Sequence, residues 1–170
     1  MATAAVPKVI KNFNLFVDGV GYAGLVDSVS LPDIELTVED HRAGGMDGSI
    51  PLDLGMEPIE MSFELAEHSR RIFEQFGLQN QAAVALTFRS AMVDDDTVIP
   101  YVINARGMFT SASLGEVSNG QKNPLSVTIK LRYFRLEQAS VELWEIDVLN
   151  MIRKIAGVDQ LAAQRAAIGM

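Results

Sequence analysis

The sequence contains no cysteine and only two histidines. Without cysteine, a disulfide framework, a thiolate metal site and a thiol nucleophile are all excluded. His41 and His68 stand far apart without the spacing of paired metal ligands, so we expect surface or capping roles for both. The chain also lacks a G-x-S-x-G elbow, a Walker phosphate loop and an H-E-x-x-H motif. We therefore predict no catalytic residue, no metal site and no cofactor.

Positive charge and long apolar runs are scarce as well. The chain has 14 Lys and Arg against 22 Asp and Glu, a net charge of −8 and a pI near 4.7. Such a molecule repels nucleic acid and anionic lipid. No stretch of about 18 consecutive apolar residues is present, and "MATAAVPKVIKNF" lacks the basic and apolar regions of a secretion signal. We expect synthesis in the cytosol, no membrane binding and no ordinary DNA-binding function.

What the chain does contain is enough apolar sequence for one ordered domain. Of its 170 residues 48% are hydrophobic and 21% are charged, which is typical of a globular protein. We predict a single domain over residues 1–170 with a flexible N-terminus at 1–12. Alternating apolar and polar residues predict strands at 13–17, 28–31, 34–39, 58–65, 83–90, 101–114, 125–134 and 141–146.

Gly19, Gly21 and Gly24 have the spacing G-x-G-x-x-G that can hold a dinucleotide pyrophosphate. That function requires a helix directly after the last glycine, because helix N–H groups receive the phosphate. The sequence that follows, "LVDSVSLP", alternates as a strand does and then reaches a proline. We predict that these glycines form a turn between strands and not a nucleotide site.

The predicted fold is mainly β, with two packed antiparallel sheets in a β-sandwich or flattened barrel. The helical spacing of apolar residues before Gly77 predicts a short flanking helix at 67–77. The segment 41–55 holds four glycines and a proline, which predicts a long Gly-rich loop without a regular helix or central strand. C-terminal helices are predicted over 148–170, with Asp147 and Asp159 as their caps.

The number of predicted strands raises the question of how the sheet edges are protected. A lone β domain must keep its edge strands from pairing with other chains. Pairing with neighbouring copies in a head-to-tail ring would satisfy the same backbone groups. The pattern therefore favours a subunit whose edges become interfaces.

Three stretches resemble the major tail tube proteins of contractile-tailed phages, which also occur as the tube of R-type pyocins. They are "NLFVDGVGYAGLVDSVSLPDI", "HRAGGMDGSIPLDLGMEPIEMSFEL", and the run from "YFRLE" through "ELWEIDVLNMIRKIAGVDQLAAQRAAIGM". The similarity runs from about Asn14 to Met170 and is general between about Gln79 and Lys122. It is most specific in "RAGGMDG", in "DLGMEP" and in the C-terminal pattern "EID…N…GVDQL…R…IG". It implies hexameric rings that stack into a hollow tube inside a contractile sheath, in the tail of a virion assembled in the bacterial cytoplasm.

The resemblance also implies partners and roles for particular residues. The expected partners are further copies of the chain, the sheath, a tape-measure protein in the lumen, a baseplate tube initiator and a tail terminator, with DNA passing transiently. The segment 42–55 corresponds to an extended loop that reaches a neighbouring subunit and the adjacent ring, and its candidate contact residues are Arg42, Gly44, Gly45, Met46, Asp47 and Gly48. The alternative for this loop is a mobile surface segment without a partner.

A tube that passes DNA must not retain it, and acidic side chains on a wet strand face would repel phosphate. The candidate lumen-facing residues are Glu35, Glu39, Glu60 and Glu64, although some of them could instead contact the sheath or neighbouring copies. Two other functions stay open at this stage. One is the tube of a DNA-free bacteriocin or injection device, and the other is a nucleotide-dependent enzyme that uses Gly19 to Gly24.

Overall fold

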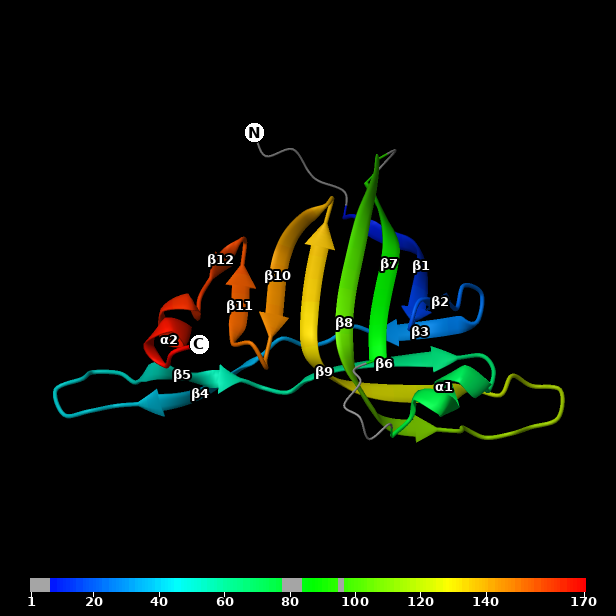
Figure 1. Cartoon of the computed structure of the whole chain (residues 1–170), viewed down its shortest axis with the longest axis horizontal. Helices are drawn as coiled ribbons and strands as arrows, with labels where there is room; N and C mark the ends of the chain where they lie inside the picture. Colours follow the sequence, from blue (N-terminus) through cyan, green and yellow to red (C-terminus); the bar gives the residue numbers. More distant parts are fainter. Residues whose placement is uncertain (1–6, 78–83, 95–96) are drawn as a thin grey trace.

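The computed structural model describes residues 7–77, 84–94 and 97–170 and shows a mainly β protein (Figure 1). The prediction of antiparallel sheets with one short flanking helix is confirmed. Apart from that helix and a second one near the C-terminus, the described elements are strands: β1 (Val9–Val17), β2 (Val20–Gly21), β3 (Val26–Ser30), β4 (Leu36–His41), β5 (Ile50–Met56), β6 (Ile59–Leu65), β7 (Val84–Asp94), β8 (Thr97–Ser113), β9 (Leu125–Gln138), β10 (Val141–Asp147), β11 (Ile152–Ile155) and β12 (Val158–Asp159). The helices are α1 (Arg70–Gln75) and α2 (Ala162–Ala167).

Ten of the strands form one antiparallel sheet. Its main path is β12-β11-β10-β9-β8-β7-β1-β2, and β6 pairs with both β9 and β3 off this path. The long strands β8 and β9 bend, so their first and last halves belong to different layers. In Figure 1 the upper parts of β7 to β10 run upright, whereas β3, β6 and the lower parts of β8 and β9 run across them. The result is the sandwich-like arrangement expected from the sequence.

The bend in β8 and β9 is made at Gly107. The register between these strands shifts between Arg106 and Gly107. A side chain at position 107 would collide with the carbonyl oxygen of Lys130 and the side chain of Ile129. Glycine is therefore the residue that lets the two backbones approach closely at the fold between the layers.

The core lies between the two layers and follows the predicted alternation. In β6, Ile59, Met61, Phe63 and Leu65 are buried, and the residues between them are not. Phe63 meets Phe109 of β8 edge to face, with ring centroids 6.2 Å apart. Each such side chain contributes about 1.5–3 kcal/mol when it leaves water. The other fully buried large side chains are Leu15, Ile72, Leu86, Ile103, Leu125, Val127, Ile129 and Ile146.

The prediction of helices over 148–170 is wrong for most of that range. Residues Ile152–Ile155 form β11, which pairs with β10 so that Ile155 lies opposite Trp144. Asp147 does cap backbone N–H groups, those of Leu149 and Asn150, but the capped structure is a strand-to-strand turn and not a helix. Only α2 is helical, because pairing with β10 outweighs the weak helical spacing of two isoleucines.

Two further predicted boundaries need correction. The flexible N-terminus was expected to reach residue 12, but β1 begins at Val9, where it pairs with Val93 of β7; residues 1–6 lie outside the described part. The Gly-rich loop was expected to span 41–55, but Ile50–Met56 form β5, paired with β4. Strand pairing is possible there because β4 and β5 form a separate two-stranded sheet in which both strands are edges, where proline is tolerated.

Candidate functional site

The β4–β5 hairpin projects from the body of the molecule, and we call residues 36–56 the arm (Figure 1). Five of its large apolar side chains are between 41% and 59% exposed. A two-stranded hairpin in water is only marginally stable, and apolar side chains gathered on such an element mark an interaction surface. These side chains belong to Leu36, Val38, Ile50, Leu52 and Leu54.

The tip of the arm holds all six residues predicted to contact other subunits, from Arg42 to Gly48. The tip is turned back on itself. Arg42 Nε donates to the carbonyl oxygen of Met46 over 3.3 Å, and the Met46 N–H donates to the carbonyl oxygen of Ala43 over 3.2 Å. Gly45 has a φ of +90°, a backbone conformation that residues other than glycine rarely adopt. The loop that the sequence predicted is therefore an eight-residue turn, 42–49, at the end of a strand pair.

The four candidate lumen acids lie on the arm, at its root and on β6. Glu35 and Glu60 line one shallow hollow beside the root of the arm, together with Asp33, Glu57 and Pro58. Glu39 lies on the arm itself, and Glu64 lies further along β6. Glu60 is also paired with Lys130, with 3.1 Å between Oε1 and Nζ, which reduces the charge that it presents.

The arm and the C-terminal segment 148–170 are joined by charged groups. Arg153 Nη2 of β11 lies 2.8 Å from Asp53 Oδ2 of β5. The hydrogen bond from Arg153, followed by the one from the Gly55 N–H, holds the pKa of Asp53 below its ordinary value of 3.8. Below this pair, a groove of about 680 Å³ runs between the root of the arm and the C-terminal segment.

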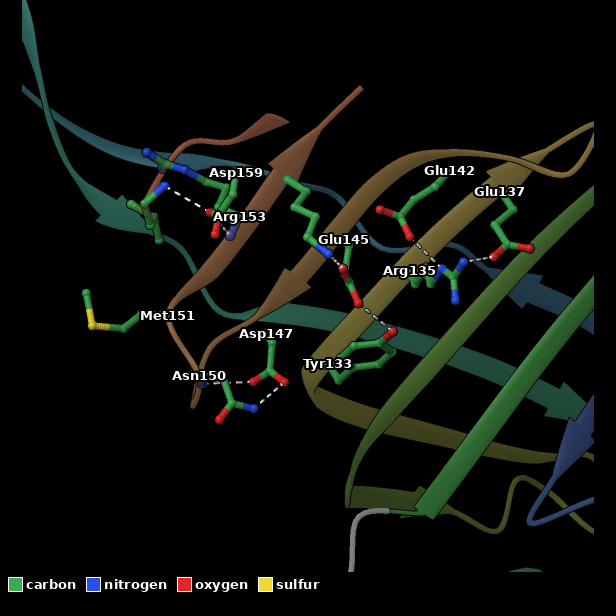
Figure 2. A network of polar contacts seen from close by, with 12 residues as sticks. Tyr133, Arg135, Glu137, Glu142, Glu145, Asp147, Asn150, Met151, Arg153 and Asp159 are labelled. Atoms are coloured by element: carbon green, nitrogen blue, oxygen red, sulfur yellow. Dashed lines mark hydrogen bonds and ion pairs between the residues drawn. The ribbon is translucent and has the colours of Figure 1, made fainter. Parts of the chain in front are cut away.

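A second charged network covers one face of β9, β10 and β11 (Figure 2). Arg135 lies between two carboxylates, 2.5 Å from Glu137 and 2.8 Å from Glu142. Tyr133 donates to Glu145 over 3.1 Å, and Glu145 also accepts a hydrogen bond from Lys154. The bond from Lys154 lowers the pKa of Glu145 from its ordinary value, while partial burial and then Glu145 raise the pKa of Tyr133.

Sequence reasoning missed this network. Tyr133, Arg135 and Glu137 alternate with the buried Phe134 and Leu136, so a signal for one polar face was present. Their partners depend on which residues of β10 and β11 lie opposite, and that register is not visible in the separate segments.

The N-terminal part of β1 forms an open sheet edge. On one side β1 pairs with β7 along its length, and on the other side β2 pairs only with Phe16 and Val17. Among the described residues, no strand covers the outer edge of 9–14. Val9, Ile10 and Phe13 in this part are exposed large hydrophobic residues. Unpaired backbone next to exposed apolar side chains is the usual form of a strand-pairing site.

The glycines of the G-x-G-x-x-G spacing form a turn, as predicted. Asp18 and Gly19 have φ angles of +49° and +78° between β1 and β2, and Gly24 has a φ of +78° before β3. A strand, not a helix, follows the last glycine, so the phosphate-binding context is missing.

The two histidines lie far apart in the described structure. His41 is exposed at the end of β4, and His68 Nε2 lies 3.0 Å from the carbonyl oxygen of Leu114. Within residues 7–77, 84–94 and 97–170, no group of three or more His, Cys, Asp or Glu side chains could hold a metal ion. In the same ranges, neither helix has the length and apolar character that crossing a bilayer requires.

The exposed apolar arm and the open edge of β1 are features of a subunit that assembles with other chains. Comparison with known proteins identifies the family of this subunit. Residues 7–169 match the family model described as phage tail tube protein FII. The chain belongs to this family. It is 33% identical to the tail tube protein of Escherichia phage P2 over 171 residues, covering 98% of this chain and 99% of the relative. It is 30% identical to the major tail tube protein of Serratia phage KSP20, covering 90% of each.

A solved structure has a similar fold. A chain from the sheath-tube complex of an extracellular contractile injection system, the PVC complex in its extended state, matches with a TM-score of 0.59 at 13% identity. The match covers 77% of this chain and 91% of the other. This protein is a structural subunit of a phage tail tube and a component of the virion tail, and not an enzyme.

Proposed function

We propose that six copies of this subunit form a ring, and that rings stack into a hollow tube through which DNA leaves the virion. The open outer edge of β1 supports ring formation, because no strand within the described part of the chain pairs with its backbone groups at 9–14. A head-to-tail contact repeated with the right rotation closes into a ring. The main path of the sheet runs from β12 at one end to β1 and β2 at the other, so the open part of β1 lies far along the strand order from β12.

The arm is our candidate for contacts between subunits and between rings. The observation that carries the proposal is the set of exposed apolar side chains on an element that projects from the body. The tip residues Arg42 to Gly48 would approach the neighbouring backbone closely, where glycine is favourable. In this arrangement the apolar side chains of the arm leave water only in the assembled tube.

The acidic residues fit a conduit that does not retain DNA. With a net charge of −8, each copy adds to the repulsion of phosphate along the tube. We assign Glu35, Glu39, Glu60 and Glu64 as candidates for the lumen wall, with Glu60 weakened in this role by Lys130. The two curated relatives come from phages, which favours a DNA-carrying tail over a DNA-free bacteriocin.

Other tail components would contact the outside, the ends and the lumen of this tube. One solved structure of similar fold comes from a sheath-tube complex, which supports a contractile sheath around the tube proposed here. A tape-measure protein in the lumen, a baseplate initiator and a tail terminator complete the set of proposed partners. Assembly is proposed to take place in the cytoplasm of the bacterial host.

Deletion of residues 42–49 tests the role of the arm. We expect the variant to remain soluble and folded, because the core lies elsewhere, but to form no tubes in negative-stain electron microscopy. The control is Glu67→Gln, which changes an exposed polar residue outside the arm and should leave tubes intact. Normal-length tubes from the deletion variant would show that stacking depends on another surface.

A further inference from the structure

Strand pairing does not fix the direction in which the arm leaves the body. β4 and β5 pair with each other and form a sheet separate from the main one. At the root, the Glu57 N–H donates to the carbonyl oxygen of Glu35 over 3.0 Å, and Thr37 Oγ1 donates to Glu57 over 2.8 Å. These bonds close the hairpin at its base, but they hold its two strands to each other and not to the main sheet.

Close packing holds the arm at its root, where Met56 packs against the core, but not where the arm faces the C-terminal segment. The groove of about 680 Å³ separates Leu54 and Met56 of the arm from Met151, Ile152 and Leu161 of the C-terminal segment. An unfilled space of this size lacks the contacts that would resist tilting of the hairpin. A specific link across the groove is therefore needed to give the arm one orientation.

The Asp53–Arg153 ion pair is placed to provide that link. Arg153 is only 16% exposed and Asp53 is 43% exposed, so the guanidinium is held by the body and reaches toward the arm. The other carboxylate oxygen of Asp53 accepts the N–H of Gly55 over 2.8 Å, which orients the carboxylate. Both bonds favour the charged form of Asp53, in agreement with its lowered pKa.

The body side of this link is itself built from polar contacts. Asp159 pairs with Arg165 over 2.8 Å and accepts the N–H groups of Leu161 and Arg153 over 3.0 Å and 3.4 Å. Arg165 also donates to the carbonyl oxygen of Met151 over 2.9 Å. Because α2 buries none of its residues, these bonds hold the C-terminal segment in the shape that presents Arg153.

We propose that Asp53 and Arg153 are positioning residues, whose ion pair sets the direction of the arm and so presents its apolar side chains to a second copy of the chain. This proposal rests on the proposed function, because it takes a second copy as the partner of the arm. Partly exposed ion pairs contribute little to folding, so the pair acts on the orientation of the arm and not on the stability of the fold.

The absence of cysteine permits a direct measurement on the full chain. Spin labels at Ser49→Cys on the arm and Ser126→Cys on β9, both exposed positions, report the arm-to-body distance by double electron–electron resonance. We expect one narrow distribution for the labelled parent. Asp53→Asn and Arg153→Gln should each broaden it, and Arg153→Lys, which keeps the cation, should stay close to the parent.

The matched control is Glu74→Gln, which removes an exposed ion pair with Arg70 within α1 and should leave the distance distribution unchanged. Each variant should unfold within about 3 °C of the parent, as expected for loss of a partly exposed pair. The critical concentration for tube formation should rise up to about fivefold in Asp53→Asn and Arg153→Gln but not in Arg153→Lys.

Two results would overturn the proposal. An unchanged distance distribution in both neutralised variants would show that the pair does not orient the arm. Loss of polymerisation with an unchanged distribution would make the pair an interface contact instead. If the parent never polymerises while the neutralised variants still broaden the distribution, the proposed function fails and the positioning role stands.

Discussion

At the scale of single residues, the thirteen glycines have very different roles. Gly107 stands where β8 folds over β9, and an added Cβ would collide with backbone there. Gly44 stands at the tip of the arm, with no atom near the position of its missing Cβ. Composition alone does not distinguish these two residues. The structure predicts that alanine is tolerated at position 44 and not at position 107.

Gly107→Ala should destabilise the folded subunit by about 1–3 kcal/mol, because the backbone of β8 or β9 must move to relieve the collision. Urea unfolding of the isolated subunit, followed by circular dichroism, measures this change. Gly44→Ala is the control and should leave the free energy of unfolding nearly unchanged. Equal effects in the two variants would mean that the close approach at Gly107 is not a constraint.

Among the elements, the sequence predicted the strands better than their partners. Strict alternation identified β6, β7 and the first half of β9, because one face of each is buried in the core. β11 was missed because Ile152 and Ile155 stand three residues apart, a spacing that also fits a helix. The turn between β9 and β10 is likewise hard to recognise from sequence. Its two residues with positive φ are Ala139 and Ser140, and neither is glycine.

The candidate contact residues illustrate the same limit. The glycines and proline of 41–55 identified the tip of the arm, since turn chemistry is local. The charged links Asp53–Arg153 and Arg135–Glu142 join different segments of the chain. Their geometry depends on cross-strand register and on how the C-terminal segment folds back, neither of which local patterns contain.

The ion-paired strands β9, β10 and β11 predict how stability depends on pH. The pKa values of Glu145 and Asp159 lie below their ordinary values of 4.5 and 3.8, chiefly because of hydrogen bonds from Lys154 and from the Leu161 N–H. Their contribution is therefore complete above pH 4.5 and is lost as the pH falls through the lowered values. The raised pKa of Lys154 adds a contribution that is lost only above pH 10.5.

Urea unfolding at pH 7, 4.5 and 3 checks this expectation. The parent should lose stability between pH 4.5 and 3, and Glu145→Gln should lose less, because its amide does not titrate. Glu67→Gln, which changes an exposed glutamate outside the network, is the control and should follow the parent. A steeper loss in Glu145→Gln than in the parent would contradict the assignment.

On the scale of the whole molecule, net charge opposes assembly. Each copy carries a charge of −8, so copies brought together in a tube repel one another. Apolar contacts of the arm and strand pairing at β1 would have to exceed this repulsion. The repulsion is long-ranged and the contacts are short-ranged, so added salt should weaken the repulsion more than the contacts.

Raising the ionic strength from about 10 mM to about 150 mM shortens the screening length from about 30 Å to about 8 Å. We therefore expect the critical concentration for tube formation to fall over this range, as measured by sedimentation and electron microscopy. A control series with the 42–49 deletion should show no tubes at either ionic strength. A critical concentration that rises with salt would mean that ion pairs between copies dominate the contact.

The continuous pairing of β8 with β9 also bears on how the subunit resists force. The two strands pair from Tyr101 opposite Gln138 to Ser113 opposite Ser126, across both layers, with register shifts between Arg106 and Gly107 and between Phe109 and Ser111. A pull along these strands would shear many hydrogen bonds together, whereas a pull across them would open the bonds one after another. The subunit should accordingly be stiffest along its longest hairpin, and a load that travels in that direction would strain the fold least.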